Sequence, residues 1–163
     1  MMAIDPGASG GIAWRDRDGI VQAAAMPEGM TATVDLLRWL ADEMPTLRVT
    51  VEKVGTYVSG NSGPSAATFA AHCGGLRWAL YALGIPQERE PTAHTWQKWL
   101  GVPVEPPLPK DMDPKARRAE LAARKRRRKA YVQEAMQKAH PHLRVTLKTA
   151  DALGILAYAE RSA

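Results

Sequence analysis

Residues 1–14, MMAIDPGASGGIAW, decide the fold class, because they predict two strands joined by a tight turn. The apolar run at 1–4 predicts the first strand, and residues 11–14 predict the strand that returns beside it. The proline and glycines between them suit a sharp reversal of the chain. Asp5 stands at the end of the first strand, although aspartate is a poor strand residue. A turn aspartate that bonds its own backbone would explain this position, so the other acids of the chain must decide its role.

The rest of the chain predicts a mixed sheet with helices on both faces, which is an α/β fold. Alternating apolar residues, helical apolar stripes and Gly or Pro breaks set the expected elements. The further expected strands are residues 19–26, 47–54 and 85–92, and the expected helices are residues 31–44, 65–83, 93–101, 114–139 and 149–161. We expect residues 1–163 to form one domain, with a proline-rich loop at 102–114 and a basic helix at about 114–139.

Composition points to a globular protein of the cytoplasm. The chain has 163 residues, of which 45% are hydrophobic, so it can bury one substantial core. No apolar run approaches the ~20 residues that span a bilayer, and the first residues lack the features of a signal peptide. The single cysteine, Cys73, excludes an internal disulfide and offers no zinc cluster. We therefore expect a cytoplasmic protein with no membrane partner.

The charge of the chain is concentrated in one segment. Residues 110–148 hold 13 of the 22 Lys and Arg but only 4 of the 17 Asp and Glu. This segment carries a net charge of +9, whereas the remaining residues carry −4. A strongly basic segment on a mildly acidic body predicts a polyanionic partner that approaches from one side.

Two further acidic residues are candidates for the same site as Asp5. Glu52 lies in an apolar strand, and Asp151 lies in the first turn of the last helix. Alone, Glu52 suits an exposed edge strand, and Asp151 suits the helix dipole. If the first and fourth strands are neighbours, however, Asp5 and Glu52 lie side by side, and the last helix can bring Asp151 over them. Three carboxylates so close repel one another unless a cation joins them. Hard oxygen ligands suit Mg²⁺ or Mn²⁺, and a two-metal site of this kind hydrolyses phosphodiesters.

Five stretches of the chain resemble a RuvC-type Holliday junction resolvase of the phage-like branch, in the RNase H-like superfamily. They are AIDPGASGGIAW, VTVEKV, SAATFAAHCGGLRWALYALGIP, HTWQKWLGV and TADALGILAYAER, in the order of the family. The resemblance implies an RNase H-like mixed five-stranded sheet flanked by helices on both faces. It also implies metal-dependent cleavage of branched double-stranded DNA by a homodimer, in a bacterial or phage-infected host cell. By resemblance, Asp5, Glu52 and Asp151 are the metal-binding acids.

Lys148 departs from the family pattern. The family usually has a fourth metal-site residue, Asp or His, one helical turn before the final acid, and Lys148 stands there. A protonated lysine cannot bind a metal, so we expect the second metal to bind weakly. We also expect Lys148 to lie near the site and to pair with Asp151 or Glu52. Three interpretations stay open: three acids suffice, another residue takes the place, or the chain is a catalytically weak or inactive nuclease-fold DNA-binding protein.

Two segments are candidates for DNA contact. The first is the consecutive basic run Arg124, Lys125, Arg126, Arg127, Arg128 and Lys129, which covers every face of its helix. Such a run predicts phosphate contacts and a steep dependence of affinity on salt. The second is the loop after Glu52, in which Tyr57, Ser59 and Asn61 are the candidate contacts, with Tyr57 or Phe69 able to stack at a junction.

Two other enzyme classes compete with this interpretation. A different RNase H-like nuclease, acting on RNA–DNA hybrids or as an exonuclease, has the same acids. A sugar-kinase or actin-like ATPase also opens with an aspartate and a glycine-rich turn between strands. That fold needs two such domains, and 163 residues hold only one.

Overall fold

A mixed five-stranded sheet forms the centre of the molecule. The computed structural model describes residues 1–55 and 63–161. The strands are β1 (Met2–Asp5), β2 (Gly11–Arg15), β3 (Val21–Ala25), β4 (Val49–Val51) and β5 (Gln87–Arg89). Their order is β3-β2-β1-β4-β5. The pairs β1–β2 and β2–β3 are antiparallel, whereas β1–β4 and β4–β5 are parallel. The predicted fold class, a mixed five-stranded sheet of the RNase H-like type, is confirmed.

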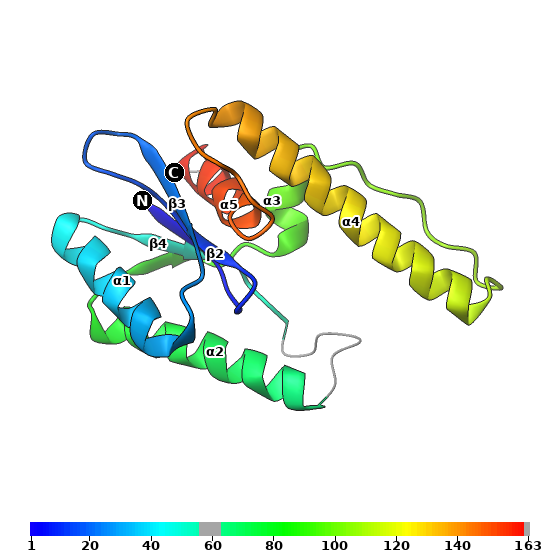
Figure 1. Cartoon of the computed structure of the whole chain (residues 1–163), viewed down its shortest axis with the longest axis horizontal. Coiled ribbons are helices and arrows are strands. Elements are labelled where there is room, and N and C mark those ends of the chain that lie inside the picture. Colours follow the sequence, from blue (N-terminus) through cyan, green and yellow to red (C-terminus); the bar gives the residue numbers. More distant parts are fainter. Residues whose placement is uncertain (56–62, 162–163) are drawn as a thin grey trace.

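Helices cover both faces of this sheet (Figure 1). On one face lie α1 (Gly29–Glu43) and α2 (Gly63–Ala82). On the other lie α3 (Ala93–Trp99), α4 (Pro114–Ala139) and α5 (Ala150–Arg161). No helix within residues 1–55 and 63–161 combines the length and the apolar character needed to cross a bilayer.

Alternation along β1 divides its side chains between the two cores. Met2 and Ile4 are fully buried against α1 and α2, whereas Ala3 is fully buried on the face that α5 covers. The neighbouring residue on that second face, Ala13, is equally small and equally buried. Small side chains allow α5 to lie close to the sheet, so a polar residue next along β1 is brought directly beneath that helix.

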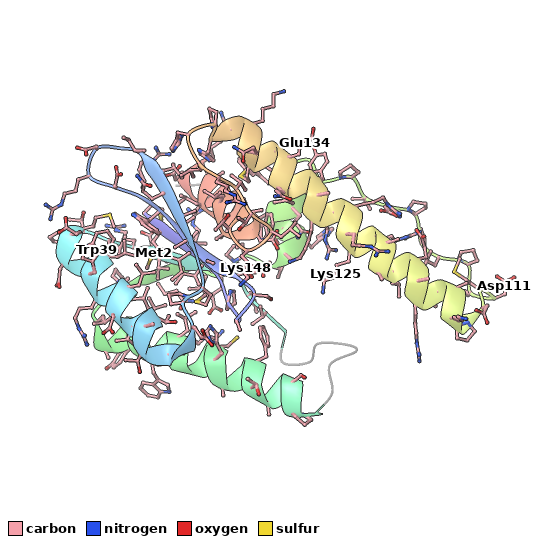
Figure 2. The ribbon with its side chains drawn as sticks, in the orientation of Figure 1. Met2, Trp39, Asp111, Lys125, Glu134 and Lys148 are labelled. Atoms are coloured by element: carbon pink, nitrogen blue, oxygen red, sulfur yellow. The ribbon has the colours of Figure 1, made fainter. Side chains whose placement is uncertain are left out.

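The first half of α4 projects from the body as an arm (Figure 1). The buried residues of α4 are Val132 and Met136, both in its second half. Residues 102–113 run outward beside the first half of α4 without helix or strand, and Arg117 and Arg124 donate to the carbonyl oxygens of Pro109 and Pro106. Figure 2 shows Asp111 at the far tip. We define residues 102–128 as the arm; apart from Val102, which is buried in the core, polar contacts hold it.

The glycine that starts β2 is required by close packing. A Cβ atom on Gly11 would lie 2.4 Å from the backbone oxygen of Lys148 and 2.8 Å from that of Ala24. Backbone oxygens cannot rotate away, so Gly11→Ala should lower the free energy of unfolding by about 1–3 kcal/mol. Gly74→Ala is the matched control, because nothing described lies within 4 Å of its added Cβ. A glycine inside a helix costs roughly 0.5–1 kcal/mol relative to alanine, so the control should stabilise. Urea denaturation of both variants measures this, and equal stability losses would contradict the close approach.

Candidate active site

Strand register places two acids side by side. Ile4 of β1 pairs with Val51 of β4, and the Glu52 amide donates to the Ile4 oxygen at 2.9 Å. The next residue of β1 is Asp5, so Asp5 and Glu52 are neighbours at the carboxyl ends of parallel strands. The sequence placed Glu52 inside a strand over 47–54, which is wrong, because β4 ends at Val51. The ladder nevertheless continues far enough to fix the glutamate.

The third acid comes from the helix above. Asp151 lies in the first turn of α5, and 16% of its side chain is exposed. Its charge raises the pKa of both Asp5 and Glu52, which shows that the three carboxylates share one environment. The expectation that the last helix brings its acid over the strand ends is confirmed. Within the described ranges, no three His, Cys, Asp or Glu side chains lie close enough to hold one ion.

Burial makes the negative charge of these acids costly. Desolvation, and then the charges of Glu52 and Asp151, raise the pKa of Asp5 to about 8. The neutral Asp5 carboxyl donates a hydrogen bond to Glu52. Burial also raises the pKa of Glu52, although Trp96 Nε1 donates to its Oε1 at 2.9 Å and opposes the shift. Trp96 is fully buried, and its bond to Glu52 was not predicted.

Three cations of α4 face the acids. Lys129 Nζ lies 3.8 Å from Asp151 Oδ2, and Lys125, Arg128 and Lys129 all lower the pKa of Asp151, against the larger effect of burial. Arg128 acts on Glu52 as well. The spacing of these three residues places them on one side of a helix. Figure 2 shows Lys125 directed away from Glu134, which lies on the far side of α4. The basic helix therefore supplies part of the counter-charge that the acids require, and their pKa values stay raised.

The expected ion pair of Lys148 is not found. Lys148 lies in the turn before α5 and is exposed, and among the described residues the lysine that pairs with Asp151 is Lys129. Lys148 instead lines a hollow of about 600 Å³ between the β1–β2 turn and the first half of α2. The other residues along this hollow are Gly7, Ala8, Ser9, Pro64, Ser65, Thr68, Phe69 and His72. A catalytic role for Lys148 stays a prediction.

Part of the predicted DNA-binding run is engaged within the chain. Arg124 Nε lies 3.0 Å from Glu105 and 3.2 Å from Glu120, and Arg127 NH2 lies 2.7 Å and 2.8 Å from the same two carboxylates. We call these four residues the arm clamp. The sequence missed it, although the spacing of Glu120 and Arg124 is typical of a helical ion pair. Arg126, by contrast, is exposed and forms no ion pair with another described residue.

The second predicted DNA contact, the loop with Tyr57, Ser59 and Asn61, lies outside the described residues. Phe69, also named for stacking, lies in α2, and a Cβ on Gly7 would approach its ring to 2.9 Å. Phe69 therefore lies against the turn that follows Asp5.

Comparison with known proteins supports the fold alone. No protein-family model and no curated protein matches the sequence. Among solved structures, T. thermophilus RuvC in complex with a Holliday junction substrate is similar, with a TM-score of 0.55 and 14% identity over 99% of this chain and 96% of that one. A structure of Thermus thermophilus RuvC gives a TM-score of 0.48 and 16% identity over 99% and 97% of the two chains. The chain therefore has a RuvC-like fold.

The raised pKa of Asp5 predicts a distinctive pH dependence. Between its ordinary value of 3.8 and about 8, folded Asp5 holds a proton that the unfolded chain releases. Stability should therefore fall as the pH rises through this window. Asp5→Asn removes this cost and should raise the free energy of unfolding at pH 8, in EDTA, by on the order of 2–4 kcal/mol. Denaturant titrations at pH 5 and pH 8 measure the effect. Asp42→Asn, at an exposed position on α1, is the control, and equal pH profiles for Asp5→Asn and wild type would contradict the raised pKa.

Proposed function

We propose that this protein is a metal-dependent endonuclease of the RuvC type, in its phage-like branch, that cleaves branched DNA such as Holliday junctions. The observation that carries the proposal is the meeting of Asp5 at the end of β1, Glu52 just after β4 and Asp151 in the first turn of α5, where the chain balances only part of their charge. The similar fold of a protein solved with a Holliday junction substrate supports the choice of DNA. Other RNase H-like nucleases would use the same acids, so the substrate is what the tests must establish.

The acids fit a divalent cation by their chemistry. All three are half-buried carboxylates, and Mg²⁺ or Mn²⁺ prefers such hard oxygen ligands. A proton on Asp5 and the ammonium of Lys129 now reduce the charge that such an ion would balance. Asp5, Glu52 and Asp151 do not lie close enough together in the free chain to hold one ion, so they would hold the metal only after their side chains draw together around it. A bound metal would supply an activated water and a counter-charge for the phosphate. Lys148 stands in place of a fourth ligand, so the proposal requires only one firmly bound ion.

Positive groups flank the acids on two sides and define a path for DNA. On one side lie Lys125, Arg128 and Lys129 of α4. On the other lies the hollow between the β1–β2 turn and α2, with Lys148 on its wall. A phosphate backbone bound between these groups would pass over the acids. In this path Lys148 serves as a phosphate contact.

A homodimer is part of the proposal, because resolving a four-way junction needs two symmetric cuts. The face of α2 that points away from the sheet is suited to the contact. Trp78 and Tyr81 are 72% and 80% exposed and pack edge to face at 6.1 Å. The buried residues of α2, Leu76, Ala79 and Leu80, all lie in its second half. The alanine-rich first half is therefore open to a partner.

A second candidate function is junction binding without turnover. The contact of Lys129 with Asp151, the proton on Asp5 and the position of Lys148 favour it. The same cations would hold DNA phosphates in either case. The first experiment below separates the two functions.

A supercoiled plasmid with an extruded cruciform tests cleavage and dimerisation together. With Mg²⁺ or Mn²⁺, a dimeric resolvase should make paired cuts and yield linear DNA, whereas independent single cuts yield nicked circles. Asp5→Asn should lose at least about 100-fold in rate, because the metal loses a ligand, while its affinity for the junction in EDTA stays equal or rises. Turnover by Asp5→Asn at saturating metal would contradict the assignment. Wild type that binds junctions but never cuts would establish the second function.

Adjacent arginines offer a matched test of the DNA path. Arg128 faces the acids, whereas Arg127 is held in the arm clamp. Arg128→Gln should weaken junction binding several-fold and reduce the slope of log K against log salt by roughly 1. Arg127→Gln should leave that slope unchanged and change the stability only slightly, because exposed ion pairs contribute little. Fluorescence anisotropy at several salt concentrations measures both. Equal slopes for the two variants would show that the run binds without a preferred face.

A further inference from the structure

The arm and α3 enclose a cavity that the proposed cleavage reaction does not use. Its volume is about 240 Å³. His94, Gln97 and Lys98 line it from α3, and Arg124 and Arg128 line it from α4. Each set has the spacing of neighbours on one side of a helix. Residues 102–105 form the rest of the wall.

Four polar side chains of this cavity have no hydrogen-bond or ion-pair partner among the described residues. No hydrogen bond or ion pair of the described residues engages the side chains of Gln97, Lys98 or Arg128, nor that of His94. The apolar part of the wall contains Val102, which is 8% exposed, and Val104, which is 80% exposed. The cavity therefore offers the unpaired charges of Lys98 and Arg128, the amide of Gln97 and an exposed apolar surface. Such a site suits a ligand that combines a negatively charged group with a flat ring able to form hydrogen bonds.

An ion-pair network within the chain holds the walls of this cavity in place. Arg124 and Glu105 both line it, and the arm clamp joins them at 3.0 Å. The clamp satisfies the charge of Glu105, so the unpaired charge that faces the cavity is positive. Without the clamp the proline-rich wall would have no ionic tie to α4.

The cavity adjoins the acids through two residues. Arg128 lines the cavity and also lowers the pKa of Glu52 and Asp151. On α3, Trp96 holds Glu52 from one side of the helix, while Gln97 and Lys98 turn toward the cavity on the other. A DNA strand whose phosphate lies over the acids would therefore have its next nucleotides within reach of the cavity.

We infer that this cavity binds a single unpaired nucleotide of the DNA strand, with its phosphate on Lys98 and Arg128 and its base between Gln97 and Val104. This inference rests on the proposed function for the identity of the DNA. The volume lies below the ~300–1,000 Å³ of sites for drug-sized ligands, which fits one base and excludes a duplex. The amide of glutamine offers a donor and an acceptor to a base edge. Bases at a branch point are stacked less fully than bases inside a duplex, so the extrusion of one of them costs less there.

Fluorescence of 2-aminopurine, placed at successive nucleotides of a four-way junction, tests the inference in EDTA, where binding is seen without cleavage. One position near the branch point should brighten when the full-length protein binds. Gln97→Trp, which fills the cavity, should abolish the change and weaken binding about 5- to 50-fold, as expected when one nucleotide loses its contacts. Lys98→Gln should reduce the salt slope by roughly 1.

Lys138→Gln is the matched control, because it removes the same charge in the last turn of α4, ~15 Å along the helix from Arg128. If no position brightens, or if the cavity variants behave like this control, the inference is wrong. If wild type binds junctions no better than linear duplex, the proposed function fails instead. A single strand carrying the same probe then decides the cavity alone, because its nucleotides need no extrusion. Brightening there that Gln97→Trp abolishes supports the inference, and no change overturns it.

Discussion

The mutual repulsion of three half-buried carboxylates is the constraint on which the rest of the structure depends. Parallel pairing of β1 with β4 sets Asp5 beside Glu52, and the small residues Ala3 and Ala13 let α5 bring Asp151 down on them. Such an arrangement costs free energy unless charge is neutralised. In the chain as it stands, a proton on Asp5 and the ammonium of Lys129 do this. A metal cation could replace the proton on Asp5, and a DNA phosphate could take over the contact with Lys129. We therefore interpret the three acids as a candidate catalytic site.

The acids could be predicted from the sequence because their positions follow from strand geometry. Side chains alternate along a strand, so Asp5 shares a face with Ala3, and Glu52 shares a face with Thr50. The exact end of β4 could not be predicted, because Glu52 continues the ladder with only one backbone bond, to the Ile4 oxygen. Lys148 was expected to be the counter-charge because it precedes Asp151 by one turn. Its long side chain reaches the hollow beside α2 instead, and the lysine that meets Asp151 comes from another helix. Contacts between helices far apart in sequence are not contained in local spacing.

The basic run at residues 124–129 also shows that contacts between distant segments cannot be predicted from local spacing. The sequence shows six adjacent cations, and helical periodicity divides them into faces, but it does not say which face meets an acid of the chain. That depends on the path of residues 102–113, which brings Glu105 against Arg124 and Arg127. As a consequence, chemically similar residues of the run have different roles. Arg124 and Arg127 hold the arm, whereas Lys125, Arg128 and Lys129 direct their charge at the acids.

These different roles link the position of the arm to the cleavage reaction that we propose. The arm contributes to the core only through Val102, since the buried residues of α4 lie beyond it, so its position depends largely on ion pairs that are 21–54% exposed. Exposed pairs of this kind contribute little stability and weaken with salt. Arg128 and the wall of the cavity depend on that position. A bound polyanion would add contacts along the same helix, so bound DNA would help to fix the position of the arm. The free chain then holds a proton on Asp5 and pairs Asp151 with Lys129, and the substrate supplies the conditions under which the acids can accept a metal.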